Sequence, residues 1–127
     1  MFREEFKKRT KKFALRIIKL VEALPKTKTG EIVGKQLLRC GTSVAANYRA
    51  ACRAKSDLDF LSKMGIVEEE SDESIFWLEI IIDSGLMQRE LVSPLLQESN
   101  EILAIVISSK ITFKKRLKDN KDNKDNS

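Results

Sequence analysis

The sequence predicts an all-α protein folded as an up-down-up-down four-helix bundle. Apolar residues recur at intervals of three and four along four segments, which is the spacing of one face of a helix. Only two prolines and five glycines interrupt the 127 residues. The breaks between the segments are about five to eight residues long, and connections this short favour antiparallel neighbours. A chain of this length forms one domain with its own core.

The first two helices are expected at about residues 3–24 and 30–54. In the first, a single apolar stripe lies opposite a basic face, and Pro25 ends the helix because proline disfavours a helical residue before it. Thr29 is expected to cap the second helix by accepting free N–H groups of its first turn. Small residues dominate the middle of the second helix from Gly41 to Ala51, so another helix can approach it closely.

The third helix is expected at about residues 57–84. Ser56 and Asp59 resemble a capping box at its start, and Gly85 suits the left-handed residue after its end. Its second half is apolar around nearly the whole circumference, and the other three helices of the bundle can shield only part of such a surface from water. We therefore expect copies of the chain to associate as a homo-oligomer. The residues expected at this interface are Phe76, Trp77, Ile80 and Ile81.

The fourth helix is expected at about residues 94–117. Ser93 and Pro94 suit the N-cap and the first helical position, where the missing N–H of proline is not needed. Residues 1–117 thus make up the predicted bundle. Residues 118–127 repeat Lys-Asp-Asn three times without an apolar residue. Such a segment gains too little burial to offset the entropy of ordering, so we expect a disordered tail.

Charge is strongly segregated along the chain. Residues 1–55 carry 15 basic and 4 acidic side chains, whereas residues 56–101 carry 12 acidic and 2 basic ones. The basic face of the first helix is dense enough to contact nucleic-acid phosphates, although a solvated face or pairing with the acids of the third helix is an equal alternative. The candidate nucleic-acid-binding residues are Lys8, Lys11, Lys12, Arg16 and Lys19.

A polar network is expected between the second and third helices. Arginines on the second helix and carboxylates on the third share helix faces at intervals of four residues, so they are expected to pair within or between subunits. A buried asparagine also needs a partner, which we expect on a neighbouring helix. The network residues are Arg39, Ser43, Asn47, Arg49, Arg53, Glu69, Glu70 and Glu73.

Catalysis by the familiar site types is disfavoured. The chain contains no histidine, which excludes Ser-His and Cys-His nucleophiles and the Glu-x-x-His ligands of di-iron bundles. Cys40 and Cys52 lie about 18 Å apart if they share a helix, so they cannot bridge, and both are expected to be small buried side chains. We expect no cofactor and no metal. The chain shows no membrane-spanning run and begins without the apolar core of a signal peptide, so a cytoplasmic location is expected.

Two runs resemble a known family. GTSVAANYRAACRAKS at residues 41–56 and KMGIVEEESDESIFWLE at residues 63–79 are similar to the bacterial four helix bundle proteins, which are encoded in intervening sequences of the large-subunit ribosomal RNA gene. The resemblance implies a left-handed bundle, often assembled as a homopentamer. It also implies no enzymatic activity for most members, and binding of nucleic acid and a reverse transcriptase by relatives that accompany diversity-generating retroelements.

Together these patterns favour a non-enzymatic, homo-oligomeric bundle that presents a basic surface to RNA or DNA. The alternative is a protein–protein adaptor, in which the segregated charge serves the docking of subunits and of a partner polypeptide.

Overall fold

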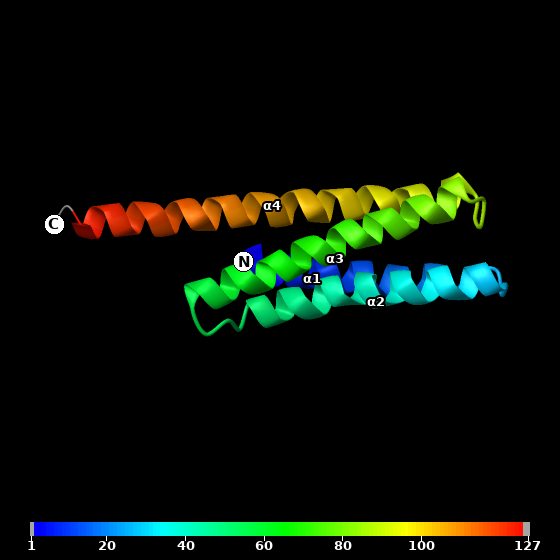
Figure 1. Ribbon diagram of the computed structural model, residues 1–127, viewed down its shortest axis with the longest axis horizontal. Coiled ribbons are helices and arrows are strands. Elements are labelled where there is room, and N and C mark those ends of the chain that lie inside the picture. Colours follow the sequence, from blue (N-terminus) through cyan, green and yellow to red (C-terminus); the bar gives the residue numbers. More distant parts are fainter. Residues whose placement is uncertain (1, 126–127) are drawn as a thin grey trace.

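The computed structural model describes residues 2–125, and these form four helices and no strand. The helices are α1 (Phe2–Glu22), α2 (Lys28–Ala51), α3 (Asp57–Asp83) and α4 (Arg89–Asp125). Successive helices run in opposite directions (Figure 1). Helix α1 packs against α2 and α4, and α3 packs against the same two helices, so the four lie in a ring of neighbours. The predicted all-α four-helix fold is confirmed.

The apolar stripes meet in one core. On α1 the stripe residues Phe6, Phe13 and Ile17 are buried, as the spacing of three and four predicts. Helix α2 contributes Leu37 and Val44, both fully buried. Fifteen further side chains from the four helices and the α1–α2 connection complete this cluster. The stripes thus determine which face of each helix turns inward.

The connection between α1 and α2 differs from the expectation at its cap. Thr27, and not Thr29, is the N-cap of α2: its side chain accepts a hydrogen bond of 3.1 Å from the backbone N–H of Gly30. A Cβ on Gly30 would lie 2.1 Å from the Pro25 carbonyl oxygen, so only glycine permits the chain to fold this closely after α1. This tight connection places Thr27 at the start of α2, so the N-cap lies two residues earlier than the expected Thr29.

The ends of α3 agree with the sequence analysis. Ser56 is the N-cap and its Oγ accepts from the N–H of Asp59 at 3.1 Å, while the Asp59 carboxylate accepts from the N–H of Lys55 at 3.0 Å. Gly85 follows the C-cap and has a φ of 75°, the left-handed conformation that glycine adopts without steric cost. Both ends of α3 could therefore be predicted from the local sequence.

Helix α4 begins earlier than predicted. It starts at Arg89, so Pro94 lies inside the helix, and the hydroxyl of Ser93 donates to the Arg89 carbonyl instead of capping. Val92 is fully buried in the core, and its burial favours a helical turn before the proline. The carbonyl of Glu90, which loses its helical partner at Pro94, belongs to an exposed residue where water can solvate it.

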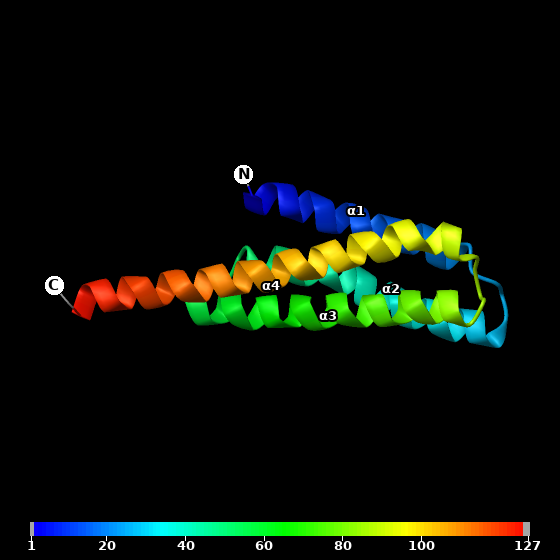
Figure 2. The same ribbon diagram turned by 90° about the horizontal axis from the view of Figure 1, so that it is seen from above.

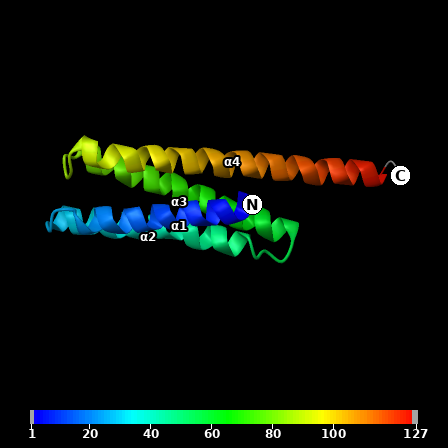
Figure 3. The same ribbon diagram turned by 180° about the vertical axis from the view of Figure 1, so that it is seen from behind.

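Helix α4 also extends farther than predicted. Residues 118–125, expected to be disordered, are helical and exposed, while residues 126 and 127 of the predicted tail lie outside the described residues. No glycine or proline follows Pro94, and extending an existing helix avoids the cost of nucleation. As a result, α4 projects beyond the other three helices (Figures 1 and 3). Among the described helices, none is both long and apolar enough to cross a membrane.

Candidate functional site

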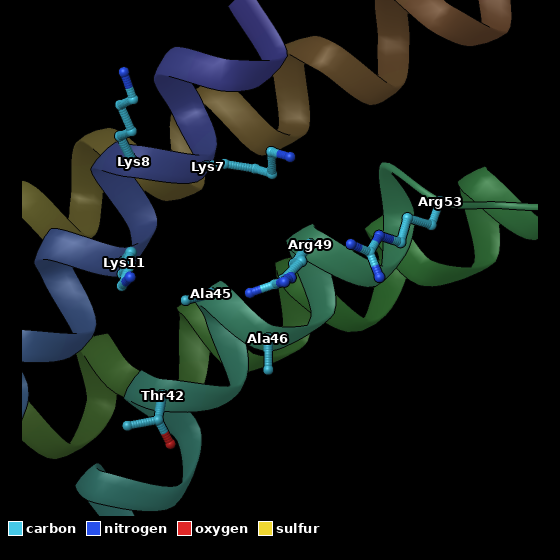
Figure 4. A pocket seen from close by; sticks show the side chains of 8 residues that line it. All are labelled: Lys7, Lys8, Lys11, Thr42, Ala45, Ala46, Arg49 and Arg53. Atoms are coloured by element: carbon cyan, nitrogen blue, oxygen red, sulfur yellow. The ribbon is translucent and has the colours of Figure 1, made fainter.

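A basic groove lies between the N-terminal half of α1 and the C-terminal half of α2, with a volume of about 550 Å³. Cationic side chains from α1 and from the end of α2 line it together with small side chains of α2 (Figure 4). We call it the α1–α2 groove. The residues that line it are Lys7, Lys8, Lys11, Thr42, Ala45, Ala46, Arg49 and Arg53.

Helical spacing places these residues together. On α1, Lys7 and Lys11 lie one turn apart. On α2, Thr42, Ala45 or Ala46, and Arg49 follow one another at intervals of three and four, so they share one face, and Arg53 lies two residues beyond the end of the helix. Two alanines in the middle of that face leave space between the flanking side chains. Small residues on α2 therefore line a basic groove as well as forming a helix-packing surface.

The positive charge of the groove is largely unopposed. No carboxylate lines it. Lys7 forms an ion pair with Glu4 at 2.9 Å, and this hydrogen bond lowers the pKa of Glu4. The other four cations make no ion pair within the part of the chain that the structure describes. Because like charges repel, such an arrangement is stabilised when an anion enters.

The predicted basic face of the first helix divides between two sides of α1. Lys8 and Lys11 line the α1–α2 groove. Arg16 and Lys19 instead line a depression between α1 and the start of α4. Lys12 is exposed and, like Arg16, its charge acts on Glu98 of α4. The five candidates therefore do not form one surface.

Arg9, which the sequence analysis missed, joins the side of α1 that carries Lys12 and Arg16 to α4. Its guanidinium donates to both carboxylate oxygens of Glu98 at 2.9 Å and 2.7 Å, and to Glu101 at 3.0 Å. The hydrogen bond from Arg9 lowers the pKa of Glu98 despite partial burial. Bidentate pairs of this kind are geometrically specific, so the Arg9–Glu98 contact fits one register of α1 against α4.

The expected polar network is present only in part. The structure brings Arg39 of α2 together with Glu70 and Glu73 of α3, and the hydrogen bond from Arg39 lowers the pKa of Glu73. Arg49, Arg53 and Glu69 are exposed and make no ion pair among residues 2–125, so they do not join the network within the chain, and their pairing between subunits stays a prediction.

The asparagine of the network also bonds differently from the expectation. Asn47 donates to the backbone carbonyl of Ser43, one turn earlier on its own helix, at 2.9 Å. It does not reach a partner on another helix among the described residues. A half-buried side chain at the helix surface finds its nearest acceptor in its own turn, so no cross-helix contact is needed.

Comparison with known proteins identifies the family of the chain. The sequence profile of the 23S rRNA-intervening sequence proteins matches residues 4–108. The chain belongs to this family. A crystal structure of a protein of unknown function from the S23 ribosomal protein family of Bacteroides thetaiotaomicron has a TM-score of 0.80 and 34% identity. That similarity covers 87% of this chain and 98% of the other. No curated protein matches.

The groove and the network lie inside the family match. Every residue that lines the α1–α2 groove falls between residues 4 and 108, as do Arg39 and its two partners. The last part of α4 lies outside it. The groove is thus built from the region that this chain shares with the 23S rRNA-intervening sequence proteins.

In this family member the expected interface residues divide between surface and core. Phe76 is 51% exposed and its ring meets Trp77 edge-on with centroids 5.0 Å apart. Trp77 and Ile80 are partly buried against the core. Ile81 is fully buried within the chain, which corrects its assignment to an outer surface. The Nε1 of Trp77 is buried and makes no hydrogen bond within the described residues, although it lies near Glu73 and helps to lower the pKa of that carboxylate.

The two cysteines, Cys40 on α2 and Cys52 directly after it, and the carboxylates of α3 form no further site in the described part of the chain. Cys40 is buried, and burial raises the pKa of its thiol. Cys52 is only partly buried, which corrects the expectation that both are buried. Between residues 2 and 125 no group of three or more cysteine or acidic side chains is placed to hold a metal ion. One acid that the sequence analysis left without a partner, Glu68, pairs with Lys110 of α4 at 3.0 Å.

Proposed function

We propose that this protein is a non-enzymatic, self-associating helical bundle that binds RNA or DNA through the α1–α2 groove. The observation that carries the proposal is the gathering of five cationic side chains around one groove without a lining carboxylate. Counterion release on contact with phosphates supplies most of the affinity of such surfaces. The association of the family with intervening sequences of 23S rRNA, given by its description, supports a nucleic acid as the anion.

The composition of the groove favours backbone contacts over base recognition. Lysine and arginine donate to phosphate oxygens, whereas the hydroxyl of Thr42 already donates to the Leu38 carbonyl at 2.6 Å. No aromatic side chain lines the groove, so bases have no platform on which to stack. The proposed binding is therefore largely independent of nucleotide sequence.

Self-association is the second part of the proposal. Phe76 is exposed, and beside it Trp77 and Ile80 form an apolar stripe on the outer side of α3. Burying this stripe between copies removes apolar surface from water and places several grooves on one particle. By family resemblance we propose a left-handed bundle that assembles as a homopentamer, and we keep the cytoplasmic location expected from the sequence as part of the proposal.

Binding is tested by fluorescence anisotropy with a labelled RNA and a labelled DNA duplex over a salt series. The parent should show log K falling linearly with log salt. A groove variant replaces Lys8, Lys11 and Arg49 with glutamine. Each lost phosphate contact should reduce the slope by about 0.9 for a duplex. Analytical ultracentrifugation of each protein reports its assembly state.

A matched control removes the same charge elsewhere. It replaces Lys12, Lys19 and Lys26, which are exposed and line no part of the groove, with glutamine. This control should keep most of the affinity and slope of the parent. Equal losses of affinity in the two variants would show that binding follows net charge alone. An affinity that does not change with salt concentration would refute the proposal.

Charge complementarity favours one alternative, a protein–protein adaptor. Helix α3 exposes Glu69, Asp72 and Glu79, and an acidic helix of a second copy or of a partner polypeptide matches the basic groove in charge. In that case the groove variant should lose self-association or partner binding. Its affinity for nucleic acid should equal that of the parent, or the parent itself should not bind nucleic acid.

A further inference from the structure

A second pocket lies at the open end of the bundle, where all four helices contribute side chains. Its volume is about 240 Å³. Tyr48 of α2 and Phe60 and Met64 of α3 are buried in the chain and line it. Phe113 of α4 lies against Phe60, with ring centroids 4.5 Å apart and planes inclined at 43°. We call this the four-helix pocket, and it has an aromatic wall and a flexible methionine.

The course of α1 and α4 explains why this end is open. Figure 2 shows the two helices close together near the α3–α4 connection and diverging toward the N-terminus of α1. Helix α4 then continues alone past the ends of the other helices (Figures 1 and 2). Pockets between the helices of a bundle are common positions for ligands.

Two arginines line the four-helix pocket together with its aromatic residues. The guanidinium carbon of Arg3 lies 4.8 Å from the centroid of the Phe60 ring, which is a cation–π contact. Arg116 lines the pocket from α4. No carboxylate lines it, and neither arginine makes an ion pair among residues 2–125. Ser109 and Thr112 add hydroxyl donors.

We propose that the four-helix pocket binds a small aromatic carboxylate. Its ring enters among Tyr48, Phe60 and Phe113, and its carboxylate is held by Arg3 and Arg116. An apolar cavity of about 150 Å³ holds benzene, so the space here admits one or two fused rings. The planar fork of a guanidinium matches a carboxylate. No residue is shared with the α1–α2 groove, so the inference does not depend on nucleic-acid binding.

The test uses two probes of equal size, 2-naphthoate and the uncharged 2-naphthalenemethanol, titrated by ligand-observed NMR and calorimetry against the full chain. The carboxylate should bind with a Kd of about 1 mM or below, and the alcohol about tenfold or more weakly. Replacing Arg3 and Arg116 with glutamine should reduce the carboxylate to the affinity of the alcohol. Thr112→Trp should abolish binding of both, because residue 112 is exposed and a large ring there fills the pocket without disturbing the core.

Two controls keep the outcomes separate. The double variant Lys114→Gln, Lys115→Gln removes the same charge from exposed positions of α4 and should bind 2-naphthoate as the parent does. The groove variant at Lys8, Lys11 and Arg49 should do the same. Circular dichroism confirms that each variant is folded. No binding at several millimolar, equal affinity for the two probes, or binding that persists in Thr112→Trp would overturn the proposal.

Discussion

Replacing Gly41 with alanine tests the close approach of α1 and α2, on which the groove depends. Gly41 is buried, and a Cβ built there would lie 2.8 Å from Cγ1 and 2.9 Å from Cγ2 of Ile17. Ile17 is fully buried and β-branched, and the χ1 angle of such a side chain is confined to one rotamer in a helix. It cannot rotate away, so the two helices must separate.

Two opposing effects determine the size of the change. Alanine improves helix propensity over glycine by about 1 kcal/mol. Forcing an extra carbon into a packed core costs about 1–3 kcal/mol, and contact with two stiff carbons favours the upper half of that range. The net expectation is a destabilisation of about 1–2 kcal/mol. For 127 residues, with about 2.1 cal/mol/K of unfolding entropy per residue, each kcal/mol lowers the Tm by about 4 °C.

The same substitution at Gly65 is the matched control. A Cβ there would meet only the Nζ of Lys110, at 4.0 Å, so the variant gains helix propensity without a clash. Gly65→Ala should stabilise the protein by up to about 1 kcal/mol. Urea unfolding followed by far-UV circular dichroism, at one protein concentration, should therefore separate the two variants by about 1–3 kcal/mol. If Gly41→Ala proves as stable as Gly65→Ala, the inferred contact with Ile17 is wrong.

Two further predictions concern local contacts. Arg9 lowers the pKa of Glu98 in the folded state, so the pair stabilises the fold above the unfolded pKa of about 4.3 and this stability is lost as pH falls through the lower folded pKa. Glu98→Gln should thus cost about 1–2 kcal/mol at pH 7 and much less near pH 3, and an equal cost at both pH values in urea titrations would contradict this account. Thr27→Ala should lower stability by about 1 kcal/mol through loss of the N-cap, whereas Thr29→Ala should change it by less than about 0.5 kcal/mol in the same assay. The reverse order would show that the cap lies at residue 29.

Local chemistry explains which features could be predicted. The stripe on α1 follows from helical spacing, and its members Phe6, Phe13 and Ile17 are buried as expected. The Ser56 cap and the Gly85 terminus depend on contacts within a few residues, so a single stretch of sequence contains all the information needed. The start of α4 is different, because burial of Val92 in the shared core outweighs the local preference for a start at Pro94.

The candidate site likewise combines features that local sequence predicts with features that depend on tertiary packing. Basic residues on α1 and α2 are evident in the sequence, but their grouping depends on the rotation of each helix about its axis. Arg49 and Arg53 were matched to acids by charge and by their spacing of four residues, whereas the structure leaves them exposed beside Lys8 and Lys11. Exposed ion pairs contribute so little that packing of the apolar faces, and not charge attraction, sets that rotation.

The sequence by itself determined that this chain forms four helices, which face of each is apolar, and how charge is distributed along it. These properties repeat every three or four residues and need only near neighbours. Tertiary structure alone decided that basic side chains of two helices line one groove, that Arg9 reaches Glu98, and that all four helices enclose a pocket beside Arg3 and Arg116. Each of these depends on distances between residues far apart in the chain, and such distances are set only when the apolar faces pack together.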